Sequence, residues 1–349
     1  MTTLRPFARI AAACASIAVV AGAAACTPSS PTKPEATSTP PRQVSLPLTG
    51  EKAEAAPDHP AVAVKIPADA PARPQTGLAA ADNVWVELVE GGEVRYNAVY
   101  YSTLPKEVGP VRSIRPVDAP INAPLRGALV TSGGQPDFLR DVGAAVGALV
   151  TEDRAGDAAW RVTSRRMPYN LYTSPERVAQ AHGDLKAPPR QWDFAANAKP
   201  PAGGEAVTDF AVTYPAWRSG WAWSGQAWQR FDNKQASADA DGTRIEATTV
   251  LVLAVETEPT SYLDPVGAPV IASKLNGSGK AKVAVDGRLI DATWHKDADG
   301  APITLSDDAG KKLSLPAGKI WIELVPASST WVTSTPAQPQ PSESEEKTK

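Results

Sequence analysis

The spacing of apolar and polar residues predicts a chain made mostly of short strands, with a few short helices between them. Apolar residues occur in short continuous or alternating runs, and Gly or Pro ends most of these runs, which is typical of strands. Helices are predicted to begin at Pro136 and Pro175, because Pro is favoured at the first helical position. Strands or hairpins are expected at residues 61–66, on both sides of Gly91-Gly92, and at residues 127–131, 250–255, 282–291, 303–315 and 319–325.

The order of these elements predicts an α+β fold, in which a mixed α/β N-terminal domain precedes a smaller, mainly antiparallel β domain. Segments near both ends of the chain contain few large apolar residues, so they cannot bury a core. The expected layout is a signal segment at residues 1–25, a disordered tether at 26–57, an N-terminal domain at 58–190, a Pro- and Gly-rich linker at 191–206, a C-terminal domain at 207–327 and a disordered tail at 328–349.

The pair Gly91-Gly92 predicts a two-residue hairpin, because primed turns need positive φ angles that glycine adopts easily. This turn places Glu87 opposite Tyr96, on a face that is otherwise apolar and aromatic. Burying a carboxylate there requires a cation or several hydrogen-bond donors, and the alternatives are an ion network that only fixes the fold or a ligand pocket. The nearest basic residues considered as partners are Arg73, Arg112 and Arg115.

A second hairpin is predicted at Asp286-Gly287 by the same turn chemistry. The expected register sets Val283 opposite Ile290 and Lys282 opposite Asp291. Between the two hairpins, Trp residues cluster at alternating positions, which indicates either buried core or exposed rings that stack on sugars, and the core interpretation is favoured. These residues are Trp217, Trp221, Trp223 and Trp228.

Arginine-rich loops and one glycine turn form the candidate binding residues. The strand at 127–131 leads into Ser132-Gly133-Gly134 and then into a helix, an order that suits an anion because free backbone N–H groups point outward there; a plain turn is the alternative. Arginine pairs well with anions because its planar fork donates two parallel hydrogen bonds. The candidate ligand-binding residues are Arg73, Gln75, Glu87, Arg95, Arg112, Arg115, Ser132 and Asn170.

Catalytic candidates are limited to carboxylates. Two of Glu87, Glu90 and Asp118 form an acid and base pair for glycan cleavage if their separation is about 5 to 10 Å. The two cysteines lie at positions 14 and 26, so the mature chain has no thiol nucleophile, and the three histidines form no recognised metal motif. Neither a cofactor nor a metal is expected, and a non-catalytic protein is favoured, although the question of catalysis stays open.

The first 26 residues predict export and lipidation. Arg5 and Arg9 precede an apolar run, Ile10–Val20, that is too short to span a bilayer comfortably. The sequence Ala-Ala-Ala-Cys26 resembles a bacterial lipobox, so Cys26 is the expected lipidation site, with cleavage by the ordinary signal peptidase as the alternative. The predicted location is extracytoplasmic and anchored to the membrane through lipidated Cys26.

The charge of the chain argues against a nucleic-acid partner. The formal net charge is −3, and removal of the signal segment with its two arginines makes it −5. A nucleic-acid-binding domain needs a basic patch or a basic overall composition. The expected partners are therefore the membrane, through the anchor, and a cell-wall or other envelope ligand.

Several motifs together resemble one family of bacterial proteins. They are ARPQTGL, ELVEGGEVR, GPVRSIRP, TSGG and YNLYTS in the first half, and GRLIDATW and LPAGKIWIELVP in the second. In this order they resemble the YerB-like lipoproteins, over about residues 47–327. The resemblance implies two adjoining domains of unknown function in a membrane-anchored envelope protein, and it implies no particular reaction or ligand. The chain departs from the family pattern at Pro67-Ala68, where members have Asp-Asn, and at Tyr169, where members often have His.

Three functions are compatible with these features. The first is a non-catalytic lipoprotein that binds an anionic or glycan ligand, or a partner, through an Arg- and Glu-lined cleft. The second is a cell-wall glycan hydrolase or transferase that uses paired carboxylates. The third is a scaffold that bridges envelope components. An open cleft with two carboxylates favours the second function, whereas Glu87 fully neutralised by arginines in a closed core favours the third.

Overall fold

The computed structural model describes residues 43–195, 201–328 and 332–337. The predicted signal segment, the lipidation site Cys26 and most of the predicted tether lie outside the described residues. All described residues belong to one compact unit, which covers residues 42–349. A chain that begins at Arg42 therefore contains every described strand pairing and is expected to fold without the preceding residues.

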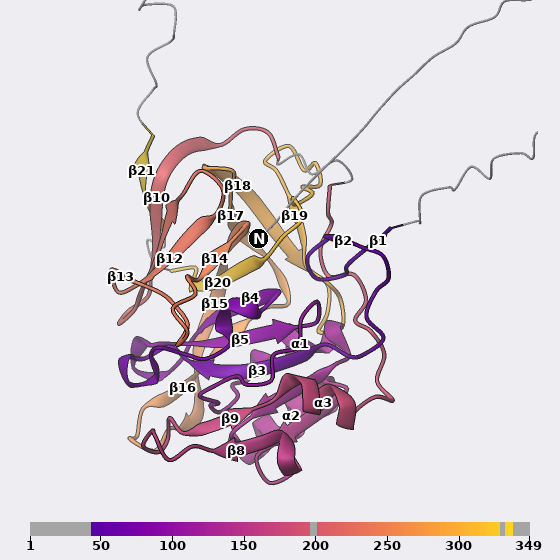
Figure 1. Ribbon diagram of the computed structural model, residues 1–349. Helices are drawn as coiled ribbons and strands as arrows, with labels where there is room; N and C mark the ends of the chain where they lie inside the picture. The colour runs from indigo at the N-terminus through magenta and orange to yellow at the C-terminus, as the bar shows by residue number, and fades with distance from the viewer. Residues whose placement is uncertain (1–42, 196–200, 329–331, 338–349) are drawn as a thin grey trace, which may run out of the picture. The chain divides into compact units, whose positions relative to one another are not determined.

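The first half of the described chain forms a mixed sheet with helices beside it (Figure 1). Its strands are β3 (Val62–Pro67), β4 (Asn83–Leu88), β5 (Val94–Tyr100), β6 (Ala128–Thr131) and β7 (Ala148–Thr151). Strand β5 pairs antiparallel with β3 and β4, whereas β3, β6 and β7 run parallel. The remaining strands and α-helices of this half are β1 (Val44–Ser45), β2 (Lys52–Ala53), α1 (Asp118–Asn122), α2 (Pro136–Ala145), β8 (Ala159–Arg161), β9 (Leu171–Thr173) and α3 (Pro175–Ala181).

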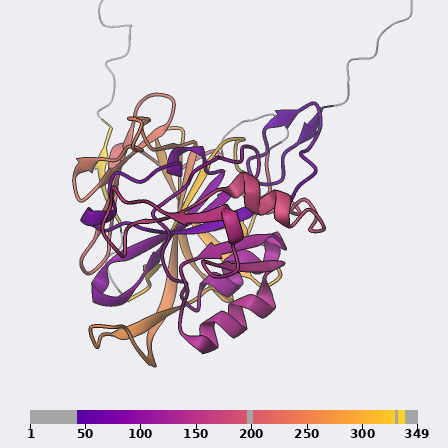
Figure 2. The same cartoon turned by 60° about the horizontal axis from the view of Figure 1, so that its bottom comes forward.

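The second half is built from strands that are mainly antiparallel. They are β10 (Glu205–Thr213), β11 (Arg218–Trp223), β12 (Trp228–Asp232), β13 (Gln235–Ala236), β14 (Glu246–Ala247), β15 (Thr249–Leu263), β16 (Pro269–Lys274), β17 (Gly277–Val285), β18 (Arg288–Lys296), β19 (Thr304–Ser306), β20 (Ile320–Pro326) and β21 (Val332–Pro336). The far part of β15 leaves the central strands and pairs with β16, so that this hairpin projects as an orange arm (Figure 2).

Strand β20 joins the two halves into one large mixed sheet. It runs parallel to β15 on one side and parallel to β4 on the other, with Ile320 opposite both Thr249 and Asn83. Since strands hold many more of the described residues than helices do, and the largest sheet mixes parallel and antiparallel pairs, the predicted α+β class describes the fold only loosely.

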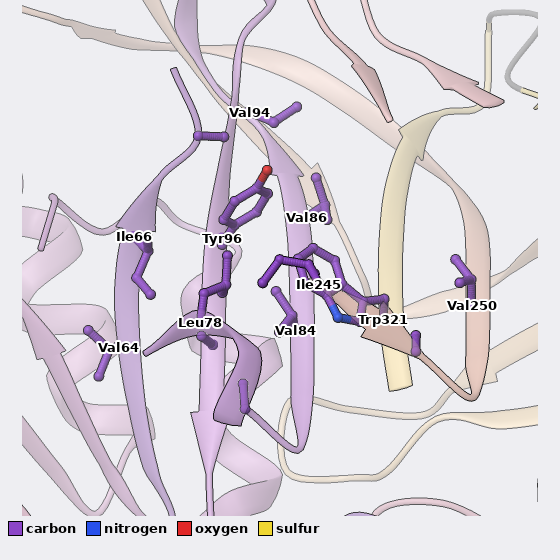
Figure 3. Packing of buried hydrophobic residues seen from close by; sticks show 14 of the residues in the cluster. Val64, Ile66, Leu78, Val84, Val86, Val94, Tyr96, Ile245, Val250 and Trp321 are labelled. Atoms are coloured by element: carbon purple, nitrogen blue, oxygen red, sulfur yellow. The ribbon is translucent and has the colours of Figure 1, made fainter. Parts of the chain in front are cut away.

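Two apolar cores lie on the opposite faces of this sheet. Alternate residues of one strand enter different cores, as Val250 and Leu251 of β15 do, because successive side chains of a strand point to opposite faces. Figure 3 shows one core, in which Val86 and Tyr96 from the first half pack near Trp321 from the second. Three of the four clustered tryptophans are buried, which confirms that they are core residues: Trp217, Trp221 and Trp228.

The predicted register at Gly91-Gly92 is wrong by one residue. Glu87 faces Arg95 rather than Tyr96, and the last pair is Leu88 with Val94. Both glycines have positive φ angles, but they end a short 3₁₀ turn over Glu90–Gly92 rather than forming a two-residue turn. The turn is wider because Gly92 O accepts a hydrogen bond from Ala216 N at 3.0 Å, a contact with the second half of the chain.

Other local predictions are confirmed. Helices α2 and α3 begin at their prolines, and the Ser174 side chain accepts a hydrogen bond from Arg177 N at 3.3 Å. The hairpin at Asp286-Gly287 has the expected register, and its Lys282 ammonium lies 2.6 Å from Asp291 Oδ1.

Candidate functional site

The structure brings two separately predicted motifs together at the carboxyl ends of β3 and β6. Ser132 N and Thr131 Oγ1 donate to Arg112 O, at 3.1 and 3.0 Å, and Ile114 N donates to Gly133 O at 3.0 Å. The glycine turn after β6 therefore lies against the segment that carries Arg112 and Arg115. Ligands of open α/β sheets often bind at this edge, beyond the carboxyl ends of parallel strands.

A cluster of fully buried charges lies beneath this edge. The Lys65 ammonium contacts Glu87 Oε1 and lies 2.9 Å from Asp118 Oδ1. Asn97 Nδ2 donates to Asp118 Oδ1 and Arg115 N donates to Asp118 Oδ2, both at 2.7 Å. Burial lowers the pKa of Lys65, and the Asp118 carboxylate partly offsets this effect. The cation that partners Glu87 is therefore Lys65 rather than one of the expected arginines.

The sheet register explains how these side chains meet. Lys65 of β3 lies opposite Asn97 of β5, and Glu87 of β4 lies opposite Arg95 of β5. Alternation along the strands places all four on one face. This face is opposite to the one shown in Figure 3, where Tyr96 lies.

Arg115 and Glu90 form a bidentate ion pair beside the buried cluster. Arg115 Nε and Nη2 lie 2.5 and 2.6 Å from the two carboxylate oxygens of Glu90, and both side chains are almost fully buried. Arg115 Nη1 also donates to Ile114 O at 2.7 Å. Such bidentate pairs are strong and directional, so the charges of Arg115 and Glu90 are satisfied within the protein.

Arg95 carries a charge that is less well compensated. Its Nη1 donates to Ser113 O at 2.8 Å, and it forms no ion pair within the described residues. Burial and the neighbouring guanidiniums of Arg115 and Arg112 lower the pKa of Arg95, and the carboxylates of Glu90 and Asp118 oppose that shift. A bound anion would relieve this excess of positive charge.

Arg112 and Arg73 have no hydrogen-bond or ion-pair partner for their side chains among the described residues. Instead they stack on aromatic rings: the Arg112 guanidinium carbon lies 5.5 Å from the centre of the Tyr169 ring, and that of Arg73 lies 5.4 Å from the Trp217 ring. The Nε atom of each arginine is buried without a partner, whereas the terminal nitrogens stay in contact with solvent. Both side chains are therefore held in place with donors free for a ligand.

Asp69 and Tyr169 border the arginines. The Tyr169 hydroxyl donates to Asp69 Oδ2, and burial together with Asp69 raises the pKa of Tyr169 to about 12. Burial and the Asp69 charge also raise the pKa of Glu93, while Arg73 opposes the shift. The site is thus a group of arginines with acidic residues at its border, and we call Arg73, Arg95 and Arg112 the arginine site.

Besides Glu87 and Arg115, two more of the predicted binding residues have structural partners within the protein. Gln75 is buried, and its Nε2 donates to Pro67 O at 3.0 Å. Asn170 Oδ1, directly before β9, accepts a hydrogen bond from Arg161 Nη1 at 2.7 Å. Ser132 does lie at the arginine site, with its Oγ 3.3 Å from Ser113 Oγ.

The three candidate catalytic carboxylates are all held by cations. Glu87 and Asp118 are fully buried and share the Lys65 ammonium, and Glu90 forms a bidentate ion pair with Arg115. Sequence reasoning missed Lys65, although a lysine inside a continuously apolar strand is itself a signal, because a buried ammonium requires a buried anion. Within the described chain, no group of three or more His, Cys, Asp or Glu side chains is arranged to hold a metal ion.

A separate cavity of about 170 Å³ lies away from the arginine site. It is lined mainly by residues 190–193, 302–305 and 312–315. A neighbouring hollow is lined by Trp85 and Trp192, whose rings stack with centres 6.0 Å apart. None of the expected binding residues lines either space, so we do not assign the site there.

Comparison with known proteins identifies the family. Residues 48–187 match the family model described as "Protein of unknown function (DUF3048) N-terminal domain", and residues 207–322 match the corresponding C-terminal domain. The chain belongs to the YerB-like family. Both halves of this YerB-like chain, including the strands and loops that form the arginine site, fall within the matched regions.

Similarity to a solved protein agrees with this assignment. The YerB-like chain is 26% identical over 302 residues to "Putative lipoprotein YerB" of Bacillus subtilis strain 168, and the alignment covers 82% of this chain and 87% of that protein. The crystal structure of the B. subtilis YerB protein matches with a TM-score of 0.69 and 25% identity, covering 81% of this chain and 97% of that one. The predicted resemblance and the two-part layout that it implied are confirmed.

Both departures from the expected family pattern lie at the arginine site. Pro67 pairs with Arg95 at the end of β3, and the Tyr169 ring lies beside the Arg112 guanidinium. Neither position supplies an ionised side chain or an imidazole here. Chemistry that depends on a carboxylate at 67 or a histidine at 169 is therefore not expected in this chain.

Proposed function

We propose that this YerB-like protein is an extracytoplasmic lipoprotein that binds an anionic envelope ligand through the arginine site. The observation that carries the proposal is the convergence of three arginines whose only side-chain hydrogen bond within the described chain is the one from Arg95 to Ser113 O. Charged donors that are held in place without a protein acceptor suit a carboxylate or phosphate. The arrangement resembles a site prepared for an anion rather than a closed structural network.

The proposed location rests on the sequence and on the relative. The signal segment ends at a lipobox-like Cys26, and the similar B. subtilis protein is named a lipoprotein. In the part of the chain that the structure describes, no helix combines the length and apolar character needed to cross a bilayer. Attachment through a lipid at Cys26 would place the arginine site near the outer face of the membrane.

Binding is favoured over hydrolysis because of where the carboxylates lie. Glu87 and Asp118 have no exposed surface. A general acid and base must reach the substrate, and a nucleophilic carboxylate must contact it. Since Glu87 and Asp118 are neutralised inside the fold by Lys65, they are not placed to act on a ligand.

Calorimetry and thermal shift with residues 42–349 test this proposal. The ligands to compare are muropeptides, teichoic-acid fragments and phospholipid head groups, each with wild type, Arg112→Gln and the control Arg154→Gln. Arg154 is exposed, and its side chain has no hydrogen bond or ion pair among the described residues. Because a hydrogen bond to a charged group contributes about 1.5–3 kcal/mol, Arg112→Gln is expected to weaken binding about 10- to 100-fold.

The outcomes separate the functions. Loss of affinity in Arg112→Gln, with no change in Arg154→Gln, supports the arginine site. Absence of binding to every ligand class, or binding that Arg112→Gln leaves unchanged, contradicts the proposal and leaves the scaffold function. Release of product from a muropeptide that depends on Glu87 would instead indicate the hydrolase.

A further inference from the structure

Large apolar side chains are exposed at two loops that border the arginine site. Among the described residues, the large apolar side chains that are mainly exposed are Met167, Leu263 and Val266, with exposed fractions of 70%, 54% and 87%. Single exposed apolar residues are ordinary on protein surfaces. Their placement is informative here because all three lie on the same two loops, next to the unpaired arginines.

The first loop is the tip of the β15–β16 arm, which contacts the start of α2. Gln135 Nε2 donates to Leu263 O at 3.0 Å, and the Tyr262 hydroxyl donates to Asp137 Oδ2. The rings of Tyr262 and Phe138 meet edge to face with centres 4.9 Å apart. Gln135 directly follows Gly134 of the glycine turn, and Ser132 N of that turn donates to Arg112 O, so these contacts connect the apolar tip to the segment that carries Arg112.

The second loop connects β8 to β9 and carries Met167. Arg165 fixes it, because its Nη1 and Nη2 donate to Ala72 O and Pro74 O at 2.8 and 2.6 Å. Tyr169 of the same loop stacks on Arg112. Met167 is therefore anchored from both sides, by the backbone next to Arg73 and by the ring next to Arg112.

Charge on the two loops is compatible with an anionic surface. The Met167 loop adds Arg165 and Arg166 to the arginines of the site, in a chain whose formal net charge is −3. The acidic residue at the arm's tip, Asp264, is turned into its own loop, where Oδ1 accepts hydrogen bonds from Val266 N at 3.0 Å and Ala268 N at 2.8 Å. Basic and apolar groups together are the combination that binds the interface of anionic membranes.

We propose that these two loops and the arginine site dock on an anionic phospholipid bilayer. Met167, Leu263 and Val266 enter the head-group region, and Arg95 and Arg112 donate to lipid phosphates. The inference rests on the proposed function, because it takes the lipid phosphate as the anion of the arginine site. It adds a partner and an orientation: the arm and the Met167 loop face the membrane that holds the lipid anchor.

Vesicle co-sedimentation tests the docking. Unlipidated residues 42–349 are mixed with vesicles of phosphatidylcholine alone or of phosphatidylcholine with phosphatidylglycerol, and the same protein is titrated with glycerol 3-phosphate by calorimetry. The variants are Leu263→Ser with Val266→Ser, Met167→Ser, Arg112→Gln and the control Arg154→Gln. All replaced apolar side chains are exposed, so thermal unfolding is expected to stay unchanged and to confirm that each variant is folded.

Binding to phosphatidylglycerol vesicles is expected to fall about tenfold in the Leu263 and Val266 double variant, because two inserted side chains are lost. Met167→Ser and Arg112→Gln are also expected to weaken it, and Arg154→Gln is not. The double variant should bind glycerol 3-phosphate as the wild type does. If the protein does not bind vesicles, or if substitution of the three apolar residues leaves vesicle binding unchanged, the proposed membrane docking is contradicted. In that case, binding of glycerol 3-phosphate that depends on Arg112 would still support the proposed function. Vesicle and phosphate binding that are both unaffected by Arg112→Gln contradict the proposed function itself.

Discussion

At the scale of single residues, Lys65 determines how the acidic side chains of the N-terminal half are used. It is fully buried and is the cation shared by Glu87 and Asp118. Removal of one partner from a buried ion pair leaves an uncompensated charge and typically costs about 3–5 kcal/mol. Lys65→Met is therefore expected to lower the free energy of unfolding by about that amount, measured by urea denaturation.

A matched exposed lysine provides the control for this change. Lys274 pairs with Glu258 at 2.9 Å, but both side chains are about half exposed. Lys274→Met is expected to change stability by less than about 0.5 kcal/mol, as is usual at surfaces. A similar effect of the two substitutions would show that the Lys65 cluster is not a buried ion network.

Asp239 predicts a specific dependence of stability on pH. Its two oxygens accept hydrogen bonds from Leu78 N at 3.0 Å and Ala79 N at 2.8 Å, and burial raises its pKa to about 6. An unfolded aspartate has a pKa near about 3.9, so the folded state binds this proton more tightly than the unfolded state. The resulting contribution of protonated Asp239 to the free energy of unfolding is fully present below about pH 3.9. It is lost as pH rises through about 6, a change of about 3 kcal/mol.

Urea denaturation of wild type and Asp239→Asn between pH 3.5 and 7 measures the contribution of Asp239 to the free energy of unfolding. The stability of the wild type relative to the variant is expected to fall as pH rises from about 4 to about 6.5, since the asparagine does not titrate. A difference that stays constant, or that grows with pH, would contradict the raised pKa.

The residues of the site could be predicted from sequence only in part. The need of Glu87 for a cation follows from its place in an apolar strand. The importance of Arg95 follows from its place in the Gly91-Gly92 hairpin, and that of Arg112 from the loop that carries it. The identity of the cation did not follow, because an error of one residue in the hairpin register turned Glu87 to the wrong face. Lys65 and Asp69 were missed since they meet their partners only through tertiary contacts.

At the scale of elements, the turn at Gly91-Gly92 decides that register. Both glycines have similar positive φ angles, 71° and 80°, but a Cβ on Gly92 would lie 2.7 Å from Pro215 Cβ, whereas a Cβ on Gly91 would meet open space. Gly91→Ala is expected to cost about 1 kcal/mol for the left-handed backbone. Gly92→Ala is expected to cost at least about 1 kcal/mol more, because the turn must also move away from residues 215 and 216.

Equilibrium unfolding of the two alanine variants gives the comparison directly. Equal losses of stability would mean that the contact between the turn and residues 215–216 does not define the hairpin.

The two hairpins also show which elements can be predicted from sequence and which cannot. Asp286-Gly287 was predicted correctly because its register depends on local turn geometry, but the wider turn at Gly91-Gly92 depends on a segment more than a hundred residues away in the sequence.

At the scale of the whole molecule, one buried arginine connects the two halves of the sheet. Arg230 lies 2.8 Å from both Asp232 and Glu323, and its guanidinium lies 4.4 Å from the centre of the Trp321 ring. Tyr96, from the first half, donates to Asp232 at 3.1 Å. Arg230→Met is expected to destabilise the compact unit by about 3–5 kcal/mol, because two carboxylates lose their cation.

The unfolding of residues 42–349 tests this coupling. Wild type is expected to unfold in one transition, because β20 pairs with strands of both halves and the two apolar cores extend across them. Two transitions in calorimetry, with Arg230→Met lowering the midpoint temperature of only one of them, would contradict this coupling of the two halves.

The sequence predicted two adjoining parts, but it could not predict the sheet that they share, because the parallel pairing of Asn83 with Ile320 has no local signal.

The central claim is that the arginine site binds an anion, and nuclear magnetic resonance of the arginine Nε–H groups in residues 42–349 tests it most directly. Arg112 Nε is buried without a partner, so its proton is expected to exchange slowly and give a separate signal. On titration with glycerol 3-phosphate, the Nε–H signals of Arg112 and Arg95 are expected to shift and saturate, while that of exposed Arg154 stays in place. No shift, or equal and unsaturated shifts of all three, would contradict the account.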